Sequence, residues 1–305
     1  MSQERFAFGK NWRRFLDVLD EDRIATAVRS LQQTLGVDRL DGTSFLDVGC
    51  GSGLFSLAAR RLGATVRSFD ADAQSVACAL ELKRRYFPDD DNWIIENGSA
   101  VGPYVLSLGK FDIVYAWGVL HHTGDMWKAI SFMPRLVADD GQICLSIYND
   151  QDYVSHWWRR LKAIYNSAPS LRPLVVGIAW LAIYGKSLAI AMLTSVFWLL
   201  CLKNPFKPFT AWYRQSFRKQ DGRGMHVWTD LVDWAGGYPF EVARPEQVFD
   251  FFRDTGFMLI HLKTTTGHGC NEFVFRRTGN IEINTAQQWV GVTGDETGGE
   301  SGYRQ

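Results

Sequence analysis

The stretch FLDVGCGSG, residues 45–53, decides how the rest of the chain is interpreted. An apolar run that ends in alternating glycines indicates a buried strand followed by a turn into a helix. Glycines let the backbone approach a ligand closely, and such a turn exposes amide donors at the helix N-terminus. The form G-x-G-x-G, preceded by Asp47, differs from the G-x-G-x-x-G of dinucleotide-binding Rossmann folds.

Strands and helices alternate on both sides of this segment. We expect strands at 44–48, 65–69, 93–96, 111–116, 142–148, 257–262 and 272–276, with helices at 10–35, 53–62, 73–86, 126–136 and 245–255. Strands that alternate with helices of this length predict a parallel sheet with right-handed crossovers.

Three further segments follow the predicted strands. Asp70 ends the second strand, 23 positions after Asp47, where its carboxylate can accept both hydroxyls of an adenosine ribose. NGSA, residues 97–100, follows the third strand, and WGVLHH, residues 117–122, follows the fourth. Ligands of open α/β sheets bind at this carboxyl edge.

These motifs, in this order, resemble the class I S-adenosylmethionine-dependent methyltransferases, especially members that act on small molecules in quinone biosynthesis or surface-glycan clusters. The resemblance covers residues 44–149, and residues 245–277 are similar to the last helix and strand pair of that fold. It implies an α/β, Rossmann-like seven-stranded sheet, mostly parallel with the last strand antiparallel, S-adenosyl-L-methionine as cofactor and no metal.

The same resemblance assigns parts of the cofactor to residues. Asp47 and the glycine loop hold the amino-acid part, Asp70 the ribose, Ser99 and Ala100 the adenine, and Trp117 presents backbone near the methionine. Many members carry Asp where this chain has Ser99. The predicted cofactor-binding residues are Asp47, Gly49, Cys50, Gly51, Gly53, Asp70, Ala71, Ser99, Ala100 and Trp117.

Methyl transfer needs the acceptor and the methyl group held in line, and a base only where the acceptor is a hydroxyl. His121 and His122 follow the fourth strand, so we predict one pointing at the substrate and one into the fold, with His122 as base or substrate contact. A pocket-lining histidine without a proton role is the alternative. The predicted substrate residues are Tyr148, Asn149, Asn271 and Glu272, although Gly, Asn and Asp are also ordinary turn residues.

A segment of nearly a hundred residues separates the fifth strand from the last helix. Residues 151–224 carry eleven Lys and Arg against two Asp, a net +9 that leaves −9 on the rest of a neutral chain. Within it, 174–202 is almost wholly apolar. We expect a helical hairpin cut at 184–186 whose basic flanks, including Arg159 and Lys162, face anionic headgroups.

A single membrane span conflicts with the topology, because the strands on either side of the insert belong to one sheet. The alternative is a lid or a homo-oligomer contact buried against protein. Near the N-terminus, residues 8–12 resemble a lid over the cofactor, or else an ordinary packing helix. The expected units are 1–40, an N-terminal helical lid; 41–150, the cofactor-binding core; 151–244, the insert; 245–277, the end of the core; and 278–305, a disordered tail.

Composition narrows the function classes. A charge balance of 33 against 33 disfavours nucleic-acid binding, and five scattered cysteines exclude a disulfide scaffold or structural zinc site. The first residues contain no apolar signal-peptide segment, so we expect a cytoplasmic protein, free or at the membrane surface. The sequence predicts a methyltransferase for a small or lipid-linked acceptor, such as a lipid-linked sugar or prenylated quinone; the alternatives are a non-catalytic cofactor-fold module or an enzyme for a soluble acceptor.

Overall fold

The computed structural model describes residues 6, 8–218, 227–267 and 269–278. Residues 1–5 of the predicted lid and 279–305 of the predicted tail lie outside this part of the chain.

One sheet of seven strands forms the centre, in the order β3-β2-β1-β4-β5-β7-β6. The first five strands pair in parallel, whereas β7 runs antiparallel between β5 and β6. The strands are β1 (Ser44–Val48), β2 (Thr65–Asp70), β3 (Trp93–Asn97), β4 (Phe111–Trp117), β5 (Val137–Tyr148), β6 (Phe257–Lys263) and β7 (Cys270–Arg277). The predicted sheet is confirmed, with β5 starting five residues earlier than expected.

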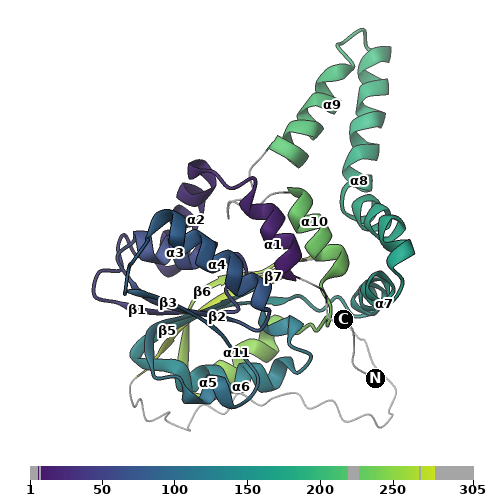
Figure 1. Cartoon of the computed structure of the whole chain (residues 1–305). Helices are drawn as coiled ribbons and strands as arrows, with labels where there is room; N and C mark the ends of the chain where they lie inside the picture. The colour runs from purple at the N-terminus through teal and green to yellow at the C-terminus, as the bar shows by residue number, and fades with distance from the viewer. Residues whose placement is uncertain (1–5, 7, 219–226, 268, 279–305) are drawn as a thin grey trace, which may run out of the picture.

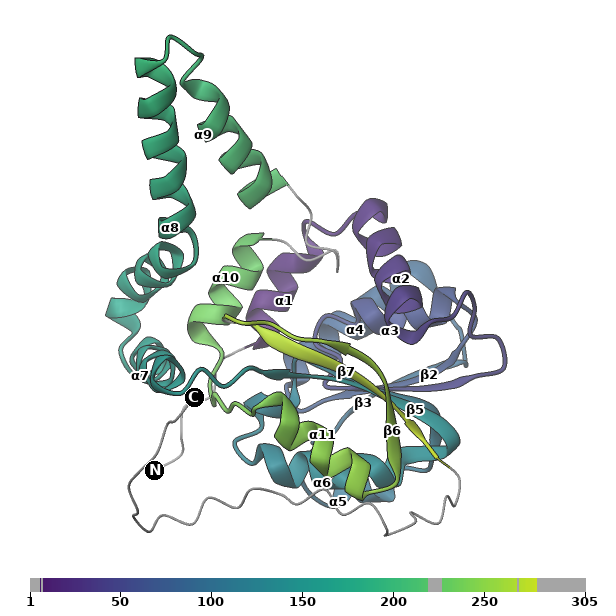
Figure 2. The same ribbon diagram turned by 180° about the vertical axis from the view of Figure 1, so that it is seen from behind.

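Helices cover both faces of the sheet (Figures 1 and 2). On one face lie α2, α3 and α4, and on the other α5, α6 and α11. Their bounds are α1 (Phe8–Leu16), α2 (Glu21–Leu35), α3 (Leu54–Arg61), α4 (Ala73–Tyr86), α5 (Pro103–Ser107), α6 (Met126–Leu136) and α11 (Pro245–Asp254). Phe45, Leu46 and Val48 of β1 are wholly buried, as a strand covered on both faces requires.

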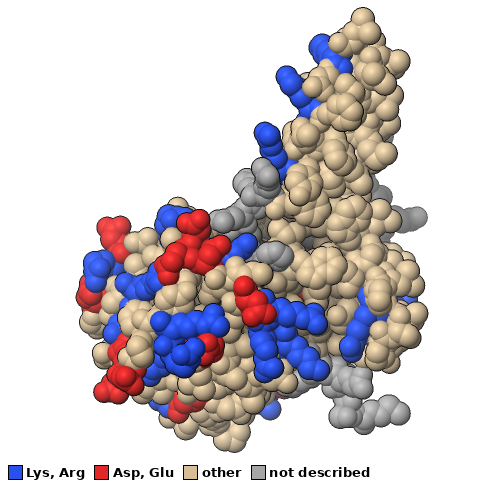
Figure 3. All heavy atoms as spheres, turned by 45° about the horizontal axis from the view of Figure 1, so that its top comes forward, with Lys and Arg blue, Asp and Glu red and all other residues tan. Residues whose placement is uncertain are grey.

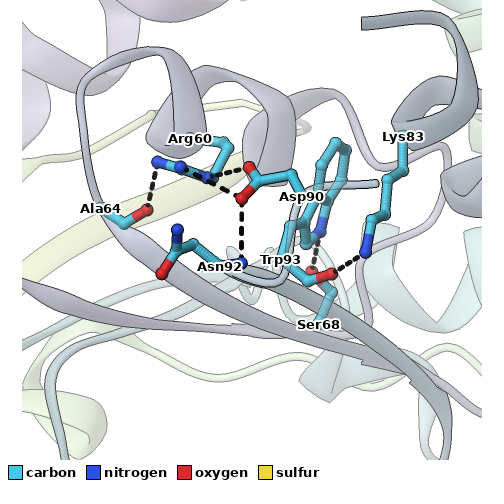
Figure 4. Close-up of polar contacts among 7 residues, drawn as sticks. All are labelled: Arg60, Ala64, Ser68, Lys83, Asp90, Asn92 and Trp93. Atoms are coloured by element: carbon cyan, nitrogen blue, oxygen red, sulfur yellow. Dashed lines mark hydrogen bonds and ion pairs between the residues drawn. The ribbon is translucent and has the colours of Figure 1, made fainter. Parts of the chain in front are cut away.

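A polar cluster attaches the edge strand β3 to the layer above it (Figure 4). Arg60 of α3 pairs with Asp90 just before the strand, at 2.5 Å between Nε and Oδ2. Lys83 of α4 donates to the carbonyl of Trp93 at 2.6 Å, and the Trp93 indole donates to the Ser68 hydroxyl of β2 at 2.9 Å. Trp93 is wholly buried, so this indole bond replaces the water that the N–H loses on folding.

The insert between β5 and α11 is helical but differs from the predicted hairpin. It contains α7 (Tyr153–Ser167), α8 (Arg172–Leu200), α9 (Phe206–Tyr213), a π-helical turn at Arg214–Arg218 and α10 (Val227–Gly236). The predicted break at 184–186 is wrong, because α8 continues through Gly185. One glycine costs a helix only about 1 kcal/mol, and the apolar helix formers around it outweigh that. The chain turns at 201–205 instead, where Leu202 has φ +55°.

Both ends of the insert meet at the carboxyl end of β5. Ala243 donates its N–H to the Tyr148 carbonyl at 3.0 Å, and Asp150 donates to the Ala243 carbonyl at 3.2 Å. From this closure α8 and α9 project away from the sheet, whereas α10 returns beside α1 (Figures 1 and 2). The insert therefore leaves the sheet and returns to it at the same place, the carboxyl end of β5.

We predict that Trp93→Phe lowers the free energy of unfolding by about 1–3 kcal/mol, because Ser68 loses its buried donor. Urea denaturation followed by circular dichroism measures the effect. Ile94→Thr on the same strand is the control: its side chain is half exposed, and surface changes are usually within about 0.5 kcal/mol. Equal losses in the two variants would contradict a stabilising role for the indole bond.

Candidate active site

A cavity of about 920 Å³ opens at the carboxyl edge of the sheet. Its wall combines the turns after β1, β2, β3 and β4 with residues of α1, α8 and α10. Elements that are distant in sequence therefore enclose a single space.

The glycine turn after β1 forms one side of the cavity. Gly49, Gly51 and Gly53 have φ of +68°, +55° and +81°, a region that side chains strongly disfavour. A Cβ on Gly51 would also lie 2.9 Å from Nε1 of Trp12 in α1. Gly49 and Gly51 line the cavity, while Gly53 packs against Ala79 of α4.

Asp70 ends β2 in the wall of the cavity. Its carboxylate accepts the N–H of Gly51 at 2.9 Å through Oδ2 and that of Asp72 at 2.8 Å through Oδ1. A carboxylate has about four acceptor positions, so it retains capacity for two ribose hydroxyls. Burial raises the pKa of Asp70 to about 6, against the opposing effect of the two amide bonds. These features fit an adenosine ligand.

Asp47 lies behind the cavity wall. The Ser56 hydroxyl donates to its carboxylate, and Ser68 donates to Ser56 at 2.8 Å, which extends the hydroxyl chain from Trp93 to the glycine turn. Burial raises the pKa of Asp47 to about 7, with a smaller contribution from the charge of Asp70. In this structure the Asp47 carboxylate joins β1 to α3 through Ser56, and the predicted contact with the cofactor stays a prediction.

The other predicted cofactor residues lie together. Ser99 caps its own turn by accepting the Val101 N–H at 3.1 Å. The cavity wall includes Cys50, Ala71, Ser99, Ala100 and Trp117.

The histidine pair lies on the short 3-10 helix Leu120–His122 after β4 and lines the cavity. Nδ1 of His122 lies 2.7 Å from the Pro239 carbonyl, which can only accept, so Nδ1 carries the proton and Nε2 the lone pair. Burial, and then the charge of Lys162, lowers the pKa of His122 to about 3. The ring is neutral at physiological pH.

His121 is wholly buried, with its ring 3.9 Å from that of Tyr148 between centroids. Neither ring nitrogen has a partner in hydrogen-bonding geometry among the described residues. Burial lowers its pKa, and the nearby Ser146 carbonyl opposes this effect. Sequence reasoning expected only one of the pair at the pocket, but both line it, and Tyr148 joins them.

Three predicted substrate residues lie outside the cavity wall. Asn271 donates to Oδ1 of Asn149 at 3.0 Å, Asn149 donates to the Thr265 carbonyl at 3.1 Å, and Glu272 pairs with Lys263 at 2.8 Å. The two asparagine contacts join the end of β5 to β7 and the β6–β7 turn, and the Lys263–Glu272 pair joins β6 to β7. The predicted contacts of these side chains with substrate stay predictions.

Several cavity residues come from outside the core motifs. Trp12 of α1 lies against Gly51 of the glycine turn, and the Phe8 ring lies 4.9 Å from that of His122, while Asp233 and Trp234 come from α10. The role of this helix as a lid stays a prediction. Lys162 is a correction: expected at the surface, it is wholly buried behind the site. Trp158 and Tyr165, four residues before and three after it, are also buried, so helical periodicity could have identified this position.

Comparison with known proteins places the chain in a family. A family model described as a methyltransferase domain matches residues 19–175, slightly more than half of the 305 residues. The chain belongs to this family, its strand order is that of the class I fold, and the family uses S-adenosylmethionine. Among the described residues, no group of three His, Cys, Asp or Glu is placed to hold a metal ion.

Curated proteins have sequences similar to part of this chain. A ubiquinone biosynthesis O-methyltransferase of Actinobacillus pleuropneumoniae serotype 5b is 30% identical over 115 residues, 36% of this chain and 47% of that protein. Its namesake in Pseudomonas paraeruginosa is 33% identical over 112 residues, 36% and 46% of the two chains. The chain thus spans about half the length of these relatives. A solved structure of magnesium protoporphyrin IX methyltransferase from Synechocystis PCC 6803 with bound S-adenosylhomocysteine covers 88% of this chain and 94% of its own, at 15% identity and a TM-score of 0.49.

We predict that affinity for S-adenosylmethionine falls as the pH drops from 8 to 5, because Asp70, with a pKa of about 6, gains a proton and loses acceptor capacity. Asp70→Asn should weaken binding at pH 8 by about 1–3 kcal/mol and flatten this dependence. Calorimetry of both proteins isolates the Asp70 contribution, because the titration of the ligand itself is common to both. Parallel pH profiles would show that Asp70 does not contact the cofactor.

Proposed function

We propose that this protein transfers the methyl group of S-adenosylmethionine to an oxygen of a small or lipid-linked acceptor at a membrane surface. The observation that carries the proposal is the continuity of the cavity. One space joins the glycine turn and Asp70 to the histidine pair and then to Ile183 and Tyr184 on α8, the long apolar helix. The names of the curated relatives, which are O-methyltransferases, support an oxygen acceptor.

The bound cofactor supplies an activated methyl group. The protein has to hold the acceptor oxygen in line with it, exclude water and receive the proton that the oxygen loses. Phe8 and Trp12 cover the cavity, and the lone pair on Nε2 of His122 is the acceptor for that proton. Methyl transfer to a neutral hydroxyl forms a protonated ether, which is a far stronger acid than an imidazolium. A weakly basic histidine is therefore sufficient to accept its proton.

We predict that His122→Ala lowers turnover by roughly a hundredfold to ten-thousandfold, as loss of a general base does, while the dissociation constant of the cofactor stays unchanged. The measurement is transfer of label from methyl-labelled S-adenosylmethionine into lipid and aqueous cell extracts. His156→Ala, at an exposed position on α7, is the matched control.

Gly51→Val should abolish both binding and transfer, since a side chain there meets Trp12. Cofactor binding by the wild type without label in either extract would favour a non-catalytic module. Label in the aqueous extract alone would favour a soluble acceptor.

The exposed part of α8 supports the proposal that the protein acts at a membrane surface. The helical stretch Pro169–Leu200 is long and apolar enough to cross a membrane, with mean hydropathy 1.8 over its 18-residue window, of which only 17% is buried. A core helix of a soluble protein would be mostly buried. Leu193, Leu200 and Leu202 are 72%, 77% and 98% exposed. Contiguous exposure of this kind marks an interaction surface.

We call residues 172–218, which contain α8 and α9, the hairpin. All the charged side chains of the hairpin have the same sign. Residues 172–218 contain six Lys and Arg and no Asp or Glu. Lys186, Lys203, Lys207 and Arg214 are exposed. Figure 3 shows Lys and Arg side chains along one edge of the part that extends from the body of the molecule. Cations beside apolar and aromatic side chains suit the interface of an anionic membrane.

The short helix α9, which leads the chain back from the turn after α8, argues against a transmembrane hairpin. α9 has eight residues, about 12 Å of helix, against a hydrocarbon core about 30 Å thick. Lys203 at the turn would also be costly deep in the bilayer. We therefore place the hairpin along the interface, with its apolar side chains among the acyl chains.

We predict that the protein sediments with vesicles containing anionic lipid, and that salt weakens this binding without abolishing it, because salt screens only the charged contribution. The Ser187 hydroxyl accepts from the Trp212 indole at 3.1 Å. Residues 188–211 can therefore be replaced by a four-residue Gly/Ser linker that leaves the cavity wall intact. The truncated protein should stay in the supernatant.

Cofactor affinity is the control for folding of the truncated protein. The triple variant Lys203→Glu, Lys207→Glu and Arg214→Glu should lose only the salt-sensitive part of vesicle binding. Equal sedimentation of the intact and truncated proteins, or none by the intact protein, would contradict the membrane assignment.

A further inference from the structure

Helix α7 presents three polar side chains on one face toward the end of α10 and the segment that follows it. Arg159, Lys162 and Asn166 are spaced i, i+3 and i+7, which places them on one side of a helix. Arg159 donates to the Phe240 carbonyl at 3.2 Å, and Asn166 to the Gly236 carbonyl at 2.8 Å. Lys162 donates to the Trp234 carbonyl. We call Arg159, Lys162 and Asn166 the α7 clamp.

The segment that the α7 clamp holds, residues 234–240, is also the wall against which His122 lies. Its Pro239 carbonyl accepts the Nδ1 proton of His122. A Cβ on Gly237 would be 2.7 Å from Cε1 of the same ring. Because the contact is so close, a shift of a few tenths of an ångström in this segment would tilt the imidazole or release its proton donor.

Lys162 is the central member of the α7 clamp. Its Nζ lies 4.6 Å from the ring centre of Trp234, 4.8 Å from that of Phe240 and 5.6 Å from that of Tyr148. The Tyr148 ring in turn lies 5.4 Å from that of His122. The ammonium is therefore separated from the histidines by one layer of aromatic rings.

The position of Lys162 has an electrostatic consequence. Its charge lowers the pKa of both histidines, after the larger effect of burial. Burial lowers the pKa of Lys162 itself to about 7, against the opposing charge of Asp233. The other titratable groups that face this pair are His121, Tyr148, Tyr238 and Arg159.

We propose that Lys162 is a positioning residue for His122: through the α7 clamp it fixes the Pro239 carbonyl that sets the tautomer of the histidine. The inference deepens the proposed methyl transfer and rests on it for its functional meaning. The conformation and protonation of His122 can be measured without any acceptor. The insert thus prepares the catalytic base as well as contacting the membrane.

The test uses full-length protein labelled with 15N-histidine, with the His122 signals assigned by their loss in His122→Gln. In the wild type the ring nitrogens should report a single Nδ1–H tautomer that stays neutral from pH 7.5 to 4. Lys162→Met keeps the length of the side chain, and an apolar residue in place of a buried charge is usually tolerated. Its His122 should show a mixture of tautomers and a higher protonation midpoint, because a nearby positive charge has been removed.

Two further variants separate geometry from charge. Asn166→Leu removes a clamp bond without changing a charge, so it should alter the tautomer ratio without raising the protonation midpoint. Lys110→Met removes an exposed charge at a remote site and should change neither. If Lys162→Met does not fold, Asn166→Leu still tests the clamp, and an unchanged tautomer there overturns the proposal.

An unchanged His122 tautomer and midpoint in folded Lys162→Met also overturn the proposal. Where an acceptor is found, turnover of Lys162→Met should fall roughly tenfold to a hundredfold with cofactor affinity unchanged. Absence of any methyl transfer, with the NMR shifts as expected, would overturn the proposed function and leave the positioning of His122 established.

Discussion

The closure of the insert at the end of β5 constrains everything outside the core of the sheet. Two backbone hydrogen bonds, from Ala243 to Tyr148 and from Asp150 to Ala243, bring residues almost a hundred positions apart to one point. The insert must therefore return to the edge from which it leaves, and that edge is the ligand-binding edge of a parallel sheet. Because Tyr148 also contacts His121, the closure is part of the active-site wall. A hairpin at any other sheet edge would lie far from the cavity.

Desolvation determines the chemistry at this edge. It raises the pKa values of Asp47 and Asp70 and lowers those of His121, His122 and Lys162. The groups remain stable because hydrogen bonds and ring faces replace the water that they lose: a hydroxyl for Asp47, two amides for Asp70, a carbonyl for His122 and three aromatic rings for Lys162. His121 differs, since neither ring nitrogen has such a partner among the described residues, which suits a contact made only when an acceptor is bound.

Local signals predicted the core, and long-range packing determined the rest. The bounds of α4 and α6 match the expected 73–86 and 126–136, because apolar periodicity is encoded within each segment and the Asp72 side chain caps the start of α4. Most predicted cofactor residues line one cavity because carboxyl ends of parallel strands converge. The break at Gly185 was wrong because one glycine rarely ends a helix that has apolar neighbours. The expected surface position of Lys162 was wrong. A charged side chain in a basic segment indicates the surface, whereas the helical spacing from Trp158 and Tyr165 indicates burial. The sequence does not separate a structural role of Asn149 and Asn271 from a substrate contact, since strand ends and turns favour the same side chains.

The two halves of α8 perform different tasks, which explains why one continuous helix serves better than the predicted pair. Val175 and Ala179 of its first half are buried against α7 and α10, and Ile183 and Tyr184 reach the cavity. Its second half is exposed and apolar. A rigid helix fixes the distance between these halves, whereas a hinge at Gly185 would leave it variable. On the proposed function, docking of the outer half therefore sets the height of the cavity mouth above the acyl chains. An acceptor anchored in the bilayer can then reach His122 along the Tyr184 side of the cavity without its apolar part crossing water.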